Sequence, residues 1–214
     1  MVPKIAVVGA GPGGCMLARL LHQHAIPCTI FEGEQSVDYR SQGGTLDLRT
    51  HTGLQAMKEA GLFSAFQEHA RYDGESLLVC DKNRRAWVKR SSRESGEKQM
   101  LVEAPEIDRA VLRQILLESV PDGVVRWDMK LERVDTDLSL HFDNGVVEGG
   151  FDLIVGADGA FSKTRQFLSS ERPFYTGLGG YQMYIPAAAE RAPEVYKYVF
   201  YVTIPSANTL YEVY

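Results

Sequence analysis

The stretch Lys4-Ile5-Ala6-Val7-Val8-Gly9-Ala10-Gly11-Pro12-Gly13-Gly14 decides the fold of this chain. Its first half is apolar and contains β-branched residues, which predicts a buried parallel strand. Leu and Met residues then repeat at helical spacing, so a helix is expected to begin inside the glycine-rich turn. A second strand is predicted over residues 26–31, and Glu32 follows it directly. Strand, turn, helix, strand and acid in this order indicate an α/β fold with a Rossmann-like parallel sheet.

The glycine-rich turn has the spacing of a site for a dinucleotide. Gly9 allows the tight turn, Gly11 lets the backbone approach a pyrophosphate, and Gly14 lets the helix pack closely on the strand. Pro12 suits the first position of a helix, and Gly13 belongs to the same turn. The free N–H groups and the positive end of the helix dipole would then face the phosphates. The alternative is a strand-to-helix turn that binds nothing.

Glu32 stands where the carboxylate of such a site meets the adenosine ribose. It would accept hydrogen bonds from the ribose hydroxyl groups, and its charge would repel a 2′-phosphate. We therefore expect FAD or NAD at this site rather than NADP.

Length and composition limit the remaining possibilities. The 214 residues suffice for one large domain, or for one domain and part of another. A net charge of −5 gives no reason to expect nucleic acid or an anionic membrane as a partner. No apolar run is long enough to span a bilayer, and the N-terminus does not have the pattern of a signal peptide. Three cysteines and five histidines are scattered without metal-ligand spacing, so we expect a cytoplasmic protein without a metal site.

The later sequence predicts more α/β structure and then a change of domain. Residues 105–116 predict a helix with Ile107 in its buried stripe and with Arg109 and Arg113 on its polar side. Residues 151–157 predict a second buried parallel strand, which ends at Asp158. Tyr, Gly and Pro become frequent from residue 172. We therefore expect a Rossmann-like, dinucleotide-binding domain over residues 1–171, with inserted β-strands, and the start of a β-rich second domain over residues 172–214. Other expected strands are 45–48, 76–80, 85–89, 124–127, 130–135, 138–142, 180–186 and 199–205, and other expected helices are 52–60, 62–70, 162–168 and one near 194–197.

Four sequence blocks carry a resemblance to a known family. They are the glycine-rich turn with Glu32, Gly-Gly-Thr-Leu-Asp-Leu at 43–48, Pro-Glu-Ile-Asp-Arg at 105–109, and residues 152–160 followed by Ser162 and Arg165. In these blocks and their order the chain resembles the single-component FAD-dependent aromatic hydroxylases, typified by para-hydroxybenzoate hydroxylase. It is most similar to the branch that contains the tetracycline-inactivating monooxygenases.

The resemblance implies roles for particular residues. Arg40 would meet NADPH, Asp47 and Arg109 would contact FAD, and Asp158 would serve both cofactors. A cation in the first turn of a helix opposes the helix dipole by roughly 0.3–1 kcal/mol, so a cofactor would suit Arg109 as a partner. The alternatives are a solvated side chain for Arg40 and Arg109, an edge-strand residue for Asp47, and a simple Asp-Gly turn at Asp158. Gln182 falls where the family's substrate sheet begins and would face the substrate, or would be an ordinary strand residue.

Two departures from the family pattern accompany the resemblance. Gly33 stands where the family usually has a basic residue. The chain also has no counterpart of the family's later Gly-Asp motif, which holds the ribityl and pyrophosphate part of FAD. We therefore expect the adenosine half of the FAD site. We expect residues 172–214 to be covered by a second copy or a partner chain, or to leave a large apolar patch exposed.

Three functions follow as hypotheses. The first is an FAD-dependent monooxygenase that uses NAD(P)H and O₂ to hydroxylate an aromatic or polyketide-like molecule, with no catalytic side chain assigned. The second is a non-catalytic nucleotide-binding relative that pairs with itself or with another chain. The third, an NAD-dependent dehydrogenase, is disfavoured by the Asp158-Gly159 block.

Overall fold

The computed structural model describes residues 2–39, 43–72, 77–81, 83, 85–90, 104–177, 185–194 and 196. The chain divides into two compact units. The first comprises Met1–Gly43, Ala56–Phe66 and Arg109–Thr176, and the second comprises Gly44–Gln55, Gln67–Asp108 and Gly177–Tyr214. The expected boundary at residues 171/172 stays a prediction.

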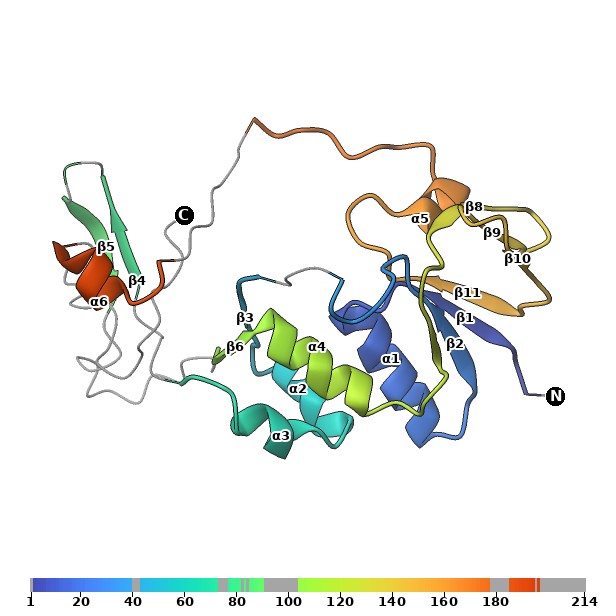
Figure 1. The fold of residues 1–214 in the computed structure, drawn as a ribbon, viewed down its shortest axis with the longest axis horizontal. Coiled ribbons are helices and arrows are strands. Elements are labelled where there is room, and N and C mark those ends of the chain that lie inside the picture. Colours follow the sequence, from blue (N-terminus) through green and yellow to red (C-terminus); the bar gives the residue numbers. More distant parts are fainter. Residues whose placement is uncertain are drawn as a thin grey trace. The chain divides into compact units, whose positions relative to one another are not determined.

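The first unit is built on a parallel sheet with the strand order β11-β1-β2-β7. These strands are β1 (Ile5–Val8), β2 (Cys28–Phe31), β7 (Val125–Arg126) and β11 (Leu153–Gly156), and all neighbours run parallel. Helix α1 (Pro12–Gln23) connects β1 to β2, and α4 (Arg109–Glu118) lies beside α1 (Figure 1). This βαβ opening confirms the predicted Rossmann-like α/β fold.

Helix α1 packs against β1 and β2, and an antiparallel sheet packs against the parallel sheet through Ala6, Val8 and Phe31. The antiparallel sheet contains β8 (Leu131–Val134), β9 (Leu140–Phe142) and β10 (Val147–Glu148), and α5 (Lys163–Leu168) packs against β8. Alternate residues of a strand point to opposite faces, so Ala6 and Val8 both face this second sheet. They form a buried core with aromatic and aliphatic side chains of the later segments: Phe31, Met129, Leu131, Leu140, Phe142 and Phe151.

The second unit contains two short antiparallel ladders in its described part. Strand β3 (Thr45–Asp47) pairs with β6 (Glu106–Asp108), and β4 (Leu77–Cys80) pairs with β5 (Ala86–Arg90). The short helix α6 (Ala188–Arg191) also belongs to this unit. Helices α2 (Gly53–Glu59) and α3 (Phe63–Gln67) lie between β3 and β4 in the sequence.

Three sequence-based expectations are corrected by the structure. Residues 106–108 form β6 rather than the start of a helix, because they pair with β3 across a long separation in sequence, and α4 begins at Arg109. Arg113 is buried rather than on the polar side of α4. Strand β11 is parallel as predicted but half-exposed, with Leu153 49% exposed, because among the described strands it pairs only with β1.

The structure confirms two predicted turns, the end of α2 at Gly61 and the hairpin at Gly145. Gly61 follows α2 with φ = 69°, and Gly145 lies between β9 and β10 with φ = 83°. Residues with positive φ suit glycine because it has no Cβ. Arg40, Gln182, the loop at 91–99 and the strand at 199–205 lie outside the described residues, as does most of the strand at 180–186.

Candidate functional site

A cleft of about 450 Å³ lies at the carboxyl edge of the parallel sheet in the first unit. Its lining comes from the turn after β1, the residues after β2, the approach to β8, and the residues after β11, together with Arg113 of α4. Gly9 N–H donates to the carbonyl oxygen of Phe31 at 2.8 Å, and Ala157 N–H donates to that of Val8 at 2.7 Å. These bonds join the ends of three strands, and ligands of open α/β sheets bind at this edge.

Two glycines of the turn are required by the protein itself. A Cβ at Gly9 would lie 2.5 Å from the Ala157 carbonyl oxygen, and the φ of Gly9 is +103°. A Cβ at Gly14 would lie 2.0 Å from the Gly9 carbonyl oxygen. Both separations are far below van der Waals contact, so only glycine fits where the turn, α1 and β11 meet.

Gly11 has a different reason to lack a side chain. A Cβ there would meet no protein atom within 4 Å, and Gly11 lines the cleft. It is the residue before α1, and Pro12 occupies the first helical position, as expected. The first N–H groups of a helix have no partners within the helix, so this end of α1 suits an anion. The space beside Gly11 therefore fits the pyrophosphate of a dinucleotide.

The carboxylate of Glu32 is held at the predicted place. Its Oε2 accepts a 2.6 Å hydrogen bond from Ala10 N–H, and its Oε1 accepts a 2.9 Å bond from Glu34 N–H. Glu32 also lines the cleft. Each carboxylate oxygen can accept two bonds, so each keeps one acceptor position for a ribose hydroxyl. Contact with the ribose stays a prediction.

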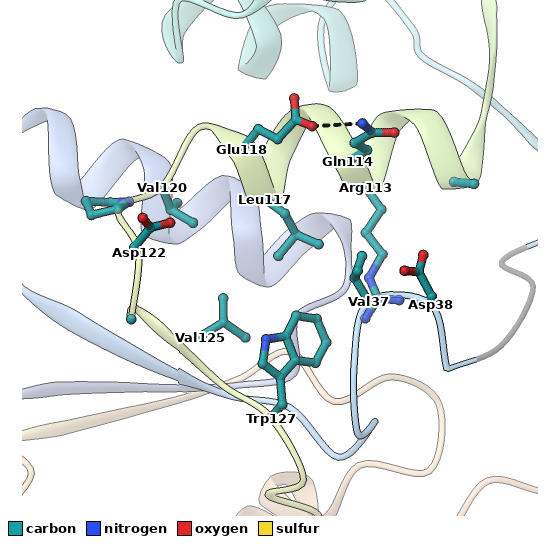
Figure 2. Close-up of a pocket in the computed structure, with 13 residues that line it drawn as sticks. Val37, Asp38, Arg113, Gln114, Leu117, Glu118, Val120, Asp122, Val125 and Trp127 are labelled. Atoms are coloured by element: carbon teal, nitrogen blue, oxygen red, sulfur yellow. Dashed lines mark hydrogen bonds between the residues drawn. The ribbon is translucent and has the colours of Figure 1, made fainter.

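Arg113 lines the cleft although the sequence did not assign it to a site. Its Nη1 donates to Glu34 Oε2 at 2.7 Å, its Nε donates to the Ala10 carbonyl oxygen at 3.2 Å, and its Nη2 lies 3.9 Å from Glu32 Oε2. Figure 2 shows this side chain reaching from α4 to a position beside Trp127, where it also lines a second cavity of about 790 Å³. A signal was present, because residues 113, 116 and 117 share the i, i+3, i+4 spacing of one face of α4.

Asp158 accepts hydrogen bonds from the start of α5 in addition to lining the cleft. Its Oδ1 accepts a 2.6 Å bond from the Ser162 hydroxyl, and its Oδ2 accepts a 2.7 Å bond from Lys163 N–H. Gly159 follows with φ = 77° and also lines the cleft. The Asp-Gly turn thus has a structural role, and contact of Asp158 with FAD or NADPH stays a prediction.

Two other predicted site residues that the structure describes, Arg109 and Asp47, are not among the residues that line this cleft. Arg109 is the first residue of α4 and is exposed; it is not among the cleft-lining residues of the first unit. Asp47 is exposed on β3 in the second unit. Their contacts with FAD, and the roles of Arg40 and Gln182, stay predictions.

The segment before β8 fills the space next to Gly33. Met129 N–H donates to the Glu32 carbonyl oxygen at 2.8 Å, which fixes the two segments side by side. A Cβ at Gly33 would lie 3.2 Å from Cβ of Lys130. The side chain of Lys130 is 72% exposed and lines the cleft, so a cation stands near the position where the family usually has one.

The thiol of Cys15 lies next to the glycine-rich turn, but it is not a candidate nucleophile. Cys15 is fully buried, its Sγ lies 3.3 Å from the Ala10 carbonyl oxygen, and burial raises its pKa to about 12. The neutral thiol is a poor nucleophile. Within the described residues, no three His, Cys, Asp or Glu side chains are grouped so as to hold a metal ion. No helix of that part has both the length and the apolar character to cross a membrane.

Curated relatives of this chain are monooxygenases. The monooxygenase penA from Penicillium thymicola is 34% identical over 208 residues, which cover 90% of this chain and 46% of that protein. The 6-hydroxynicotinate 3-monooxygenase from Bordetella bronchiseptica is 25% identical over 202 residues, which cover 86% of this chain and 48% of that enzyme. The chain therefore spans about half the length of the curated relatives it matches.

Solved structures show the same fold. Tetracycline destructase Tet(55) matches with a TM-score of 0.60 at 25% identity, over 79% of this chain and 42% of that chain. A tetrameric 2-methyl-3-hydroxypyridine-5-carboxylic acid oxygenase matches with a TM-score of 0.62 at 19% identity, over 86% and 45% of the two chains. The family described as FAD binding domain matches residues 3–189. With its parallel sheet, its glycine-rich turn and the acid that follows β2 at the cleft, this chain belongs to that family of FAD-binding domains.

Proposed function

We propose that this chain binds FAD and acts as, or within, a monooxygenase that uses NAD(P)H and O₂ to hydroxylate an aromatic or polyketide-like small molecule. Membership of the FAD-binding family and the named activities of its relatives support the proposal. The whole reaction is proposed for the protein that contains this chain, because the chain spans 46% of the first relative.

The open space beside Gly11 is the observation that carries the proposal. Gly9 and Gly14 are explained by contacts within the protein, whereas Gly11 faces only the cleft. A pyrophosphate lying there would meet the N-terminus of α1, and its adenosine would extend toward Glu32. Bound FAD supplies the redox chemistry, and this chain's residues bind and orient its adenosine half. No side chain of the described site is assigned as a general acid or base.

The absorbance spectrum of the purified protein tests the FAD assignment directly. Flavin bands near one equivalent of FAD per chain, or their recovery on titration with FAD, support the proposal. A colourless protein that takes up neither FAD nor ADP would overturn it. Oxidation of NADPH and of NADH is then compared with and without aromatic substrates, and hydroxylated product is identified by mass spectrometry.

A second candidate function is a nucleotide-binding relative that requires another chain. Large apolar side chains are exposed in the first unit after β11, including Phe161 at 83%, Phe174 at 84% and Tyr175 at 79%. Apolar surface of this kind is often covered by a partner. A homodimer or a partner chain would cover this region and residues 172–214. Sedimentation distinguishes a monomer from a dimer or a complex with another chain, and a compact monomer with ordinary turnover would contradict the second candidate.

We also propose a cytoplasmic location, which the free thiols of Cys15 and Cys28 fit.

A further inference from the structure

Arg113 is a charged side chain that is buried, and burial of a charge costs desolvation free energy. It is only 4% exposed, and its Nη1 is 2.7 Å from the carboxylate of Glu34, a residue that is 9% exposed. Desolvation offsets most of the attraction within a buried ion pair, so such a pair is a weak source of stability. Its geometry, in contrast, is tightly defined, because the planar guanidinium donates in fixed directions.

The contacts of Arg113 lead to Glu32 by two separate routes. Arg113 donates from Nε to the carbonyl oxygen of Ala10, and the N–H of Ala10 donates to Glu32 Oε2. Arg113 donates from Nη1 to the carboxylate of Glu34, and the N–H of Glu34 donates to Glu32 Oε1. Each oxygen of Glu32 is therefore fixed by a residue that Arg113 itself holds.

An aromatic ring also borders the guanidinium of Arg113. Its Cζ lies 5.6 Å from the centre of the Trp127 ring, and Figure 2 shows both side chains at the wall of the second cavity. The nearer carboxylate is that of Glu34, at 2.7 Å from Nη1, whereas Glu32 Oε2 lies 3.9 Å from Nη2 and its residue lines the cleft. The guanidinium thus acts on a ligand through the acid it orients.

We propose that Arg113 is a positioning residue that sets the Glu32 carboxylate for both hydroxyls of the adenosine ribose. This inference rests on the proposed FAD site. With both oxygens fixed, one acceptor position of each stays available to a 2′- or a 3′-hydroxyl. A turned carboxylate would serve one hydroxyl at most. Arg113 therefore determines how well the site distinguishes a ribose from a deoxyribose.

Calorimetric titration of ADP and 2′-deoxy-ADP tests this role, because ADP is the half of FAD that this cleft would hold. Arg113→Lys keeps the charge and loses the fork of donors, so ADP should bind about tenfold more weakly. The preference for ADP over 2′-deoxy-ADP should shrink toward one. In the Glu32→Ala background the same substitution should change the dissociation constant by no more than about twofold, because its effect passes through Glu32.

Arg19→Lys is the matched control. Arg19 is also an arginine of the first unit that donates to two carbonyl oxygens, those of Ala60 and Ser119, at 3.1 Å each. Its substitution should lower the melting temperature and leave the ADP preference intact. Glu34→Gln weakens the ion pair with Arg113 from the side of Glu34. It should reproduce the loss of preference for ADP over 2′-deoxy-ADP that is expected for Arg113→Lys.

The outcomes separate the inference from the proposed function. An unchanged ADP preference in Arg113→Lys, or an equal loss with and without Glu32, would overturn the positioning role while FAD binding stands. Failure of both Arg113→Lys and Glu34→Gln to fold, with Arg19→Lys folded, would likewise overturn it in favour of a purely structural role. If the unmodified protein binds neither ADP nor FAD, the proposed function itself fails.

Discussion

Replacing Gly11 by alanine should separate cofactor binding from folding. The backbone of Gly11 has φ = −72° and ψ = 175°, which any L-residue adopts, and the new Cβ would meet no protein atom within 4 Å. The remaining cost to the fold is the poorer helix cap, at most about 1 kcal/mol. A methyl group placed in the cleft should oppose the pyrophosphate by about 1–3 kcal/mol, as in other overpacked contacts. This corresponds to an FAD dissociation constant raised roughly 5- to 150-fold.

Gly14→Ala is the opposite perturbation in the same turn. Its Cβ would lie 2.0 Å from the Gly9 carbonyl oxygen, and two backbone segments would have to separate by more than about 1 Å to restore contact. We expect a loss of about 3 kcal/mol or more in the free energy of unfolding. Circular-dichroism melts measure the stability of both variants, and calorimetric titration with FAD measures binding. A Gly11→Ala protein with unchanged FAD affinity would refute the reasoning, because the cleft beside Gly11 would then not hold the pyrophosphate.

Three further predictions concern single side chains. Glu32→Ala should raise the FAD dissociation constant at least several-fold, since a bond to a charged acceptor contributes about 1.5–3 kcal/mol; an unchanged titration would remove Glu32 from the site. Asp158→Ala should lower the free energy of unfolding by about 0.5–2 kcal/mol through loss of the hydrogen bonds that Asp158 accepts at the start of α5, as measured by urea unfolding. If its FAD affinity also falls, the carboxylate serves the cofactor too. Burial raises the pKa of Cys15 to about 12 from an ordinary value of 9.0, so the unfolded thiol ionises first and stability falls as the pH rises from 9.0 toward 12. Cys15→Ala should reduce that fall in urea unfolding between these pH values, and an identical pH dependence would contradict the assignment.

The opening βαβ unit and its turn could be predicted because their causes are local. Apolar β-branched residues favour strands, Gly9 has a positive φ of +103°, and Gly14 packs against the carbonyl oxygen of Gly9 in the same turn. The Asn144-Gly145 hairpin and the end of α2 at Gly61 follow from positive φ in the same way. Glu32 was found for a related reason, since the residue after a parallel strand lies at the ligand edge.

The tertiary structure alone decided which distant groups meet. Ile107 lies at helical spacing from Val111, yet residues 106–108 form β6 because β3 supplies a ladder of hydrogen bonds. Arg113 is compatible with a solvated helix face until Glu34, 79 residues away, and the carbonyl of Ala10, 103 residues away, surround its guanidinium. Local pattern fixes the conformation of a segment, because its hydrogen bonds and steric limits lie within that segment. The partner of a buried charge depends on how separate segments pack, and a sequence pattern read along one segment does not contain that information.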